Sequence, residues 1–163
     1  MIILGIDPGT ATTGYGIIKK LNNPKTDIKN NLKCIDYGCI TTKPNISDGE
    51  RLKKINQELK KIINLYKPKI MAVESIYFFK NLKTAFPVSQ AKGVILLTAA
   101  LKKIPVYEFT PLQVKMAVVG YGKAEKKQIQ DMTKILFSLK EKPRPNDAAD
   151  ALAVAFCCSL IVE

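Results

Sequence analysis

Histidine and tryptophan are both absent from the 163-residue chain. Because imidazole is the commonest ligand of transition metals in proteins, the absence of histidine removes the usual basis of a zinc or iron site. The remaining candidate ligands for such a metal are Cys34, Cys39, Cys157 and Cys158, which lie within apolar stretches and lack the paired spacing of zinc sites. We therefore predict reduced cysteines in the core and no zinc site.

Long hydrophobic runs are also missing. No apolar stretch approaches the roughly 20 residues that a membrane-spanning helix needs. The segment Met1 to Ile6 has no basic residues before its apolar run, which reaches Asp7 at once, so it does not resemble a secretory signal. We expect a cytoplasmic protein without a membrane partner. A length of 163 residues favours a single domain covering 1–163.

Acidic residues are scarce relative to basic ones. The 26 lysines and arginines exceed the 14 acids and give a net charge of +12. This excess favours a polyanionic partner such as nucleic acid, although lysines scattered over the surface for solubility would give the same total. A metal that takes part in a reaction on nucleic acid would have to be bound by carboxylates, because the chain has no histidine and no cysteine cluster.

The order of the predicted elements indicates an α/β protein. Three consecutive strands with turn-like links predict an antiparallel meander, and the later strands alternate with helices. We predict a mixed five-stranded sheet, with the three antiparallel strands first, flanked by helices. The predicted strands are Ile2 to Asp7, Thr13 to Ile18, Leu32 to Thr42, Ile70 to Val73 and Val106 to Phe109, and the predicted helices run from Ser47 or Asp48 to Pro68, Thr84 to Leu101, Pro111 to Val119, Glu125 to Leu139 and Asn146 to Ile161.

Four carboxylates stand out from this plan. Asp7 lies in a nearly continuous apolar run, where an ionised carboxylate needs a cation or several hydrogen bonds, although an Asp-Pro-Gly turn that caps its own backbone is an alternative. Glu74 ends a second buried strand. Asp147 and Asp150 are three residues apart at the start of the last helix, so they share a face, although acids there also complement the helix dipole.

A divalent cation would make a gathering of these four acids favourable, because like charges otherwise repel. Hard oxygen ligands select Mg²⁺ or Mn²⁺. Two such ions can activate a water on one side of a phosphodiester and stabilise the leaving oxygen on the other. Because the chain also has a basic surface and no P-loop signature, the pattern favours a nuclease over a kinase.

Several motifs in this chain resemble the RuvC-type Holliday junction resolvases of the ribonuclease H-like superfamily. The resemblance runs nearly end to end, and the order and spacing of the motifs are specific. The motifs are Ile6-Asp7-Pro8-Gly9-Thr10 with Thr13-Gly14-Tyr15-Gly16, then Ala72-Val73-Glu74, then Gln90-Ala91-Lys92-Gly93, then Pro111 to Lys115 with Val118-Val119-Gly120, Gly122 and Ala124-Glu125-Lys126, and finally Asp147-Ala148-Ala149-Asp150-Ala151-Leu152-Ala153.

The resemblance implies a role for each matched residue. It implies that the catalytic, metal-binding carboxylates are Asp7, Glu74, Asp147 and Asp150, holding two Mg²⁺ ions with Mn²⁺ as a substitute. It places Lys115 and Lys126 near the scissile phosphate, where solvated surface lysines are the alternative. It also implies that Tyr77 stacks on bases of the DNA, although core packing is an alternative, and Lys80 and Lys83 could contact backbone phosphates.

The implied activity is cleavage of a four-way DNA junction by a homodimer, with symmetric nicks that leave 5′-phosphate and 3′-hydroxyl ends. We expect the dimer to form through the apolar helix Thr84 to Leu101, and a branch-migration complex to be a partner. Three alternatives remain at this level: a nuclease of the same fold acting on RNA, a catalytically idle junction-binding homologue, and an actin-like or sugar-kinase ATPase, whose opening hairpin has a similar pattern.

Overall fold

The structure, a computed structural model, describes residues 1–21, 31–75 and 82–162, with side chains described from residue 85 in the last segment. The strands are β1 (Ile2–Asp7), β2 (Thr12–Lys20), β3 (Leu32–Thr41), β4 (Ile70–Glu74) and β5 (Val106–Phe109). The helices are α1 (Asp48–Tyr66), α2 (Leu82–Leu101), α3 (Pro111–Val119), α4 (Lys126–Leu136) and α5 (Asn146–Ser159).

The strands form one five-stranded sheet in the order β3-β2-β1-β4-β5. β1 pairs antiparallel with β2, β2 pairs antiparallel with β3, and β4 and β5 continue the sheet in parallel to β1. This arrangement confirms the predicted mixed sheet with three antiparallel strands first. Because β1 and β4 are parallel neighbours, their carboxyl ends meet at one edge of the sheet, and these ends carry Asp7 and Glu74.

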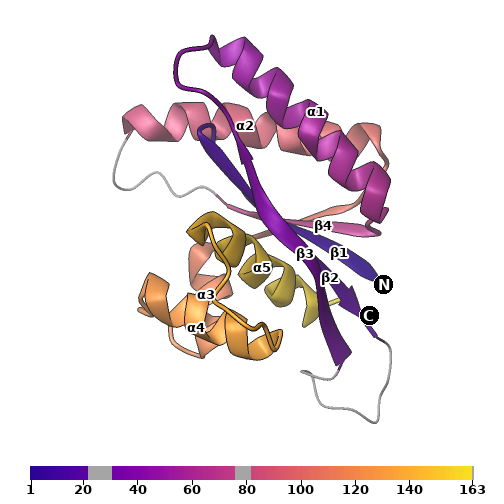
Figure 1. Cartoon of the computed structure of the whole chain (residues 1–163), viewed down its shortest axis with the longest axis vertical. Helices are drawn as coiled ribbons and strands as arrows, with labels where there is room; N and C mark the ends of the chain where they lie inside the picture. The colour runs from indigo at the N-terminus through magenta and orange to yellow at the C-terminus, as the bar shows by residue number, and fades with distance from the viewer. Residues whose placement is uncertain (22–30, 76–81, 163) are drawn as a thin grey trace.

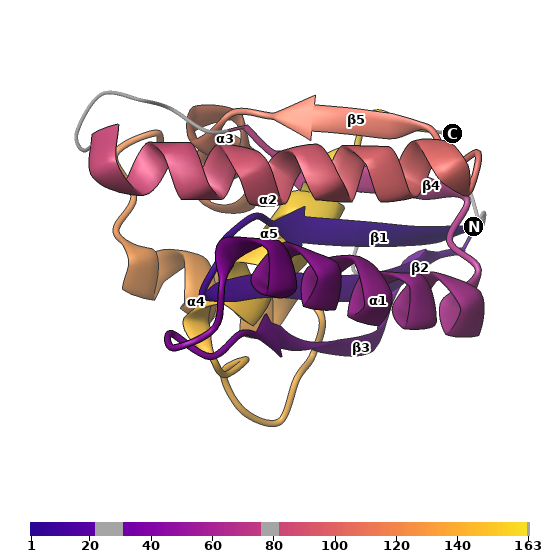
Figure 2. The same cartoon turned by 90° about the horizontal axis from the view of Figure 1, so that it is seen from above.

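One face of the sheet is covered by α1 and α2, which lie side by side across it (Figures 1 and 2). α1 begins at a Ser47 N-cap, whose side chain accepts a hydrogen bond from the Glu50 N–H, as its sequence predicts. The helix then buries a stripe of branched side chains against the sheet. The core on this face includes Leu4, Ile6, Ile17, Ile55, Leu59, Met71, Val73 and Ile95.

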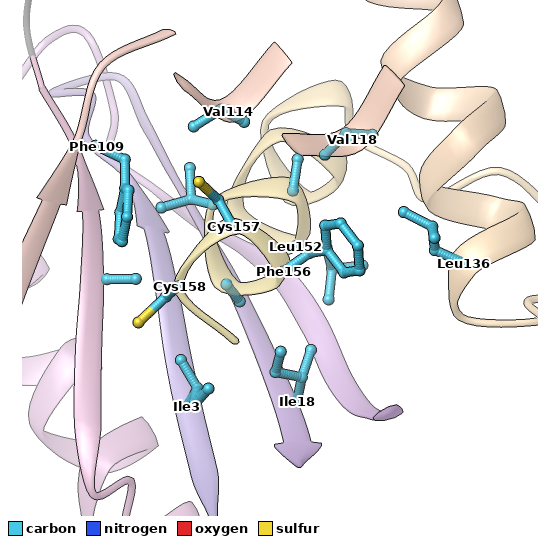
Figure 3. Packing of buried hydrophobic residues seen from close by; sticks show 14 of the residues in the cluster. Ile3, Ile18, Phe109, Val114, Val118, Leu136, Leu152, Phe156, Cys157 and Cys158 are labelled. Carbon is cyan, nitrogen blue, oxygen red and sulfur yellow. The ribbon is translucent and has the colours of Figure 1, made fainter. Parts of the chain in front are cut away.

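The other face is covered by α5, with α3 and α4 packed outside it (Figure 1). α5 is alanine-rich and buried along nearly its whole length. Figure 3 shows its larger side chains, Leu152 and Phe156, between the strands and the outer helices. Phe156 meets Phe137 edge to face, with ring centroids 6.3 Å apart. This face therefore holds its own core, separate from the core under α1 and α2.

Two glycines allow α5 to lie directly on the strands. A Cβ atom built on Gly5 would come within 2.1 Å of the Ala151 carbonyl oxygen, and one built on Gly14 within 2.0 Å of the Asp147 carbonyl oxygen. These distances are far below van der Waals contact, so only glycine fits while the helix holds this position. The contact between Gly14 and Asp147 sets the height of the acidic end of α5 above β1 and β2.

Several helix boundaries differ from the sequence prediction. α1 ends at Tyr66, before Pro68, and α2 begins at Leu82, before Thr84. The helix expected over Glu125 to Leu139 ends at Leu136, because Phe137 leaves helical geometry and Ser138 adopts a left-handed backbone with φ of 50°. The terminal helix ends at Ser159 instead of Ile161.

All four cysteines are unbonded in the structure, in agreement with the prediction of free thiols. Cys157 and Cys158 are buried as expected, whereas Cys34 and Cys39 are only half-buried because they lie on β3, at the edge of the sheet. Among the helices of the described segments, none is both long and apolar enough to span a bilayer.

Candidate active site

The candidate site lies where the ends of two parallel strands meet the start of α5. Asp7 is the last residue of β1, and Glu74 is the last residue of β4. Asp147 and Asp150 are on the first turns of α5, which Gly14 allows to approach the sheet. The structure therefore brings all four predicted carboxylates to one edge of the sheet.

The carboxylates are close enough to share an ion. One ligand oxygen from each of Asp7, Asp147 and Asp150 lies within 4.8 Å of the others. Glu74 adjoins this group through a side-chain hydrogen bond with Asp7. The sequence spacing predicts that Asp147 and Asp150 share a helix face, and both side chains do face Asp7 as members of this cluster.

The protein holds these acids in an unfavourable environment. Burial, and then the charges of Glu74, Asp150 and Asp147, raise the pKa of Asp7 to about 8. Burial, and then the charge of Asp150, raise the pKa of Glu74 to about 7, and burial also raises the pKa of Asp150. A set of crowded, partly buried carboxylate oxygens is the donor set that a hard divalent cation fits.

The hairpin that carries Asp7 is held by a chain of hydrogen bonds. The buried Thr13 hydroxyl donates to the Gly9 carbonyl across the turn at 2.6 Å. The Thr42 hydroxyl donates to the Thr10 carbonyl at 2.7 Å, and the Arg51 Nε donates in turn to Thr42 at 2.9 Å. These contacts tie the turn after Asp7 to β3 and α1, so the carboxylate projects from a fixed backbone.

Both predicted lysines lie beside the cluster. The Lys126 ammonium is 2.7 Å from the Asp150 carboxylate. Burial alone would lower the pKa of Lys126, but this hydrogen bond and the negative charges around it raise that pKa overall, so Lys126 stays protonated. Lys115, Lys126, Glu74 and Asp150 together line a hollow of about 220 Å³, which we call the first hollow. This hollow offers positive charge next to the carboxylates.

A second, larger hollow includes Asp147 in its wall, and the sequence did not predict it. It measures about 580 Å³ and is lined by Lys127, Gln130, Lys142, Pro143, Arg144, Pro145, Asn146 and Asp147. Basic residues interleaved with prolines immediately before an acidic helix are the sequence signal that marks it. We call this cavity the second hollow.

The segment after Glu74 also makes contacts that its sequence does not reveal. The Ser75 N–H donates to the Phe109 carbonyl at 2.7 Å. The Ser75 hydroxyl lies 3.4 Å from the Glu108 carboxylate, which also contacts the Lys92 ammonium of α2. β4, β5 and α2 are therefore linked directly beside Glu74.

Three predicted DNA-contacting residues cannot be placed in this site. Tyr77 and Lys80 lie outside the described residues, and for Lys83 the structure describes the backbone, within α2, but no side chain. Their proposed contacts stay predictions.

Comparison with known proteins agrees with this geometry. The sequence matches the family described as "Crossover junction endodeoxyribonuclease RuvC" over residues 3–158. It is 55% identical over 157 residues to the protein of that name from Desulforamulus reducens, covering 96% of this chain and 92% of the relative.

Solved structures give the same result. The structure of Thermus thermophilus RuvC superposes with a TM-score of 0.85 at 31% identity, covering 96% of this chain and 92% of the other. The structure described as T. thermophilus RuvC in complex with Holliday junction substrate gives a TM-score of 0.86 at 32% identity, with the same coverage of 96% and 92%.

The sheet order, the flanking helices and these superpositions define the ribonuclease H-like fold. Within that class, the chain belongs to the RuvC family of crossover junction endodeoxyribonucleases. The predictions of fold, family and enzyme class are thus confirmed.

Proposed function

We propose that this chain, as one nuclease domain over residues 1–163, cuts four-way DNA junctions by paired, symmetric, metal-dependent hydrolysis of phosphodiesters. The observation that carries the proposal is the cluster of Asp7, Asp147 and Asp150, with ligand oxygens within 4.8 Å, flanked by lysines in a strongly basic chain. Further support comes from the T. thermophilus relative, whose structure is described as a complex with a Holliday junction substrate.

In this proposal Asp7, Glu74, Asp147 and Asp150 hold two Mg²⁺ ions, which Mn²⁺ can replace. Bound ions of this kind supply an activated water and stabilisation of the leaving oxygen. Hydrolysis would join a water oxygen to phosphorus and break the bond from phosphorus to the 3′ oxygen, with a proton lost by the water and one taken up by the leaving 3′ oxygen. The products are a 5′-phosphate and a 3′-hydroxyl end.

The lysines supply positive charge to the phosphate in the reaction. Lys115 lines the first hollow beside Glu74, where it can contact a non-bridging phosphate oxygen as negative charge develops. Lys126 is already held by Asp150, so it orients that carboxylate and reaches the phosphate from the same side. Outside the described residues, we assign Tyr77 to base stacking and Lys80 to phosphate contacts, and we assign the Lys83 side chain to phosphate contacts as well.

We further propose that two copies of the chain associate through α2. This helix leaves Phe86, Leu97 and Leu101 more than half exposed, at 69%, 57% and 63%. Such side chains fit an isologous contact that brings two active sites to one junction. A branch-migration complex is the partner we propose for the dimer.

The dimer proposal is tested with Leu97→Glu, which places a charge on the exposed face of α2 without touching the carboxylates. We expect the variant to sediment as a monomer and to nick junctions on one strand at a time. A Lys61→Glu variant on the exposed surface of α1 is the control and should stay dimeric. Intact dimers of the Leu97→Glu protein would exclude this helix as the interface.

The activity itself is tested with a synthetic four-way junction, a linear duplex of the same sequence and an RNA–DNA hybrid, each with and without Mg²⁺. We expect paired nicks in the junction alone, and only with Mg²⁺. Equal cutting of the duplex or the hybrid, or cleavage that persists in excess chelator, would contradict the proposal.

A further inference from the structure

The second hollow lies next to the acidic cluster but has the opposite charge. Its wall includes the side chains of Lys127, Lys142 and Arg144, and it meets the cluster at Asp147, which belongs to both. The volume of about 580 Å³ is large enough for a nucleotide. The basic residues of this wall favour an anionic occupant over a neutral one.

The two hollows divide the basic residues at the start of α4. Lys126 faces Asp150 and the first hollow, whereas Lys127 lines the second hollow. Adjacent residues on a helix point about 100° apart, so the two lysines point in different directions. Lysines of α4 therefore line both hollows next to the carboxylates.

The cations of the second hollow are not equivalent. The Lys142 ammonium contacts the Asp131 carboxylate, which neutralises part of its charge. Within the described part of the chain, Lys127 and Arg144 make no ion pair. The guanidinium of Arg144 presents a planar fork that matches two phosphate oxygens, so it is the strongest phosphate ligand on this wall.

The backbone around the second hollow favours the same occupant. α5 begins at Asn146, and the residue before it, Pro145, has no side-chain acceptor for the first N–H groups of the helix. This positive end of the helix opens onto the hollow and attracts an anion. The carboxylate of Asp147 opposes this attraction, but in the proposed function its charge is balanced by a divalent cation.

We propose that the second hollow binds a nucleotide of the cleaved strand next to the scissile phosphate, with Arg144 and Lys127 on its phosphodiester. This inference rests on the proposed function and extends it by assigning a subsite that fixes where the strand enters or leaves the metal cluster. Arg144 and Lys127 bind the substrate here, whereas Lys115 and Lys126 act at the scissile phosphate.

A matched control exists at the opposite end of the sheet. A third basic hollow, of about 360 Å³, is lined by Lys67, Lys69, Lys102 and Lys103 near the amino ends of β4 and β5. Since Glu74 is at the other end of β4, this hollow is remote from the cluster. Lys69→Gln removes one exposed charge from a comparable cavity, so it controls for the loss of net charge alone.

The first experiment measures junction binding in chelator over a series of salt concentrations, for the wild-type chain, Arg144→Gln, Lys127→Gln and Lys69→Gln. We expect Arg144→Gln to weaken binding about 10-fold, the loss of one charge-assisted hydrogen bond. We also expect the salt dependence of log K to fall by about 0.7 to 0.9 for the lost phosphate contact. Lys127→Gln should act in the same direction, and Lys69→Gln should change binding less than about 2-fold. Equal effects of Arg144→Gln and Lys69→Gln would overturn the proposal.

The second experiment locates the phosphate. Single uncharged methylphosphonates are placed one by one on either side of the cleavage position, and single-turnover cleavage with Mg²⁺ is measured. We expect one flanking position to slow the wild-type chain and to have no added effect on Arg144→Gln. If at every position the methylphosphonate slows Arg144→Gln by the same factor as the wild-type chain, the two losses are independent and the subsite is excluded.

These experiments separate the subsite from the proposed function. If the wild-type chain does not cut junctions, the proposed function fails, while the binding series still tests the hollow. If the wild-type chain cuts and Arg144→Gln behaves as Lys69→Gln does, only the subsite fails. Thermal unfolding of each variant checks that the fold is kept.

Discussion

The two faces of the sheet are packed in different ways. Under α1 and α2 the contact is made by large branched side chains such as Leu4, Ile55 and Leu59. Under α5 there is also a side-chain core, but at Gly5 and Gly14 the backbone of the strands touches the backbone of the helix. Both faces are filled by side chains, and only the face under α5 adds these backbone contacts.

The difference matters for the active site. Where backbone touches backbone, the distance between helix and strand cannot shrink, because neither side can change its rotamer. α5 carries Asp147 and Asp150, whose oxygens must meet that of Asp7 within a few ångströms. On the face that carries the candidate site, the glycine contacts therefore set the position of the acidic end of α5.

Asp7→Asn should have the largest effect on activity. The substitution removes a charged ligand from the cluster, and we expect junction cleavage to fall by at least about 10³-fold, or about 4 kcal/mol of transition-state stabilisation. Junction binding in chelator should change little, because the affinity depends on basic residues. Cleavage assays and binding assays on the same preparation test this, and a variant that still cuts would remove Asp7 from the metal site.

Leu59→Ala should have the largest effect on stability. Leu59 belongs to α1 and is fully buried on the side of the helix that faces the sheet. Truncation leaves a cavity and should lower the free energy of unfolding by about 2–5 kcal/mol. The cleavage rate of the folded protein should stay close to that of the wild type, because the cavity is on the face without carboxylates. Denaturant unfolding and single-turnover cleavage measure both. A stable variant with slow cleavage would contradict the division between the faces.

Gly14→Ala should affect position more than stability. The added methyl would come within 2.0 Å of the Asp147 carbonyl, so α5 must move away from the sheet. We expect a loss of about 1–3 kcal/mol in the free energy of unfolding and a loss of cleavage larger than the unfolded fraction explains.

Gly49→Ala is the control for this substitution. Gly49 lies in α1, where a Cβ would meet nothing within 4 Å, so the variant should be stabilised by up to about 1 kcal/mol and stay fully active. If Gly14→Ala keeps the wild-type cleavage rate, the backbone contact does not set the site.

The response of the free energy of unfolding to pH and Mg²⁺ should be smaller than the effects of the substitutions above. The pKa of Asp7 is raised from 3.8 to about 8, and that of Glu74 from 4.5 to about 7. At a pH between its ordinary pKa and its raised pKa, each of these groups is protonated in the folded, metal-free protein and ionised in the unfolded chain. The stability of the folded protein therefore falls as the pH rises through about 7 and 8. Mg²⁺ replaces those protons, so the increase in Tm on adding Mg²⁺ should be larger at pH 8 than at pH 6.

Thermal unfolding at the two pH values checks this linkage. Asp7→Asn lacks the most strongly perturbed carboxylate, so it should lose most of the pH dependence of the Mg²⁺ effect. An equal increase in Tm at both pH values for the wild-type chain would show that the cluster is not the site of the ion.

Much of the site follows from local patterns. The apolar runs predict Asp7 within one buried strand and Glu74 at the end of another. The structure shows both at strand ends, which parallel pairing brings together. The spacing of Asp147 and Asp150 predicts a shared helix face. These inferences need only the periods of strand and helix, which neighbouring residues determine.

Other features could not be predicted from the sequence, because they depend on contacts between residues that are far apart in the chain. The end of α4 at Leu136 depends on a left-handed Ser138, a position for which glycine is the usual signal. The second hollow brings Lys127 of α4 together with Arg144 of the segment before α5. The prolines on either side of Arg144 mark its segment in the sequence, but nothing in the sequence links it to Lys127.

The order of the elements, the sheet they form and the four candidate carboxylates can be predicted from the chain, because hydrophobic period and residue type are local properties. The distance of α5 from the strands, and the lysines and arginine that surround the cluster, depend on the fold. Those outcomes depend on backbone contacts such as Gly14 against Asp147, whose partners are far apart in the chain. Local sequence predicts which residues could form the site, but the distances between them come from packing.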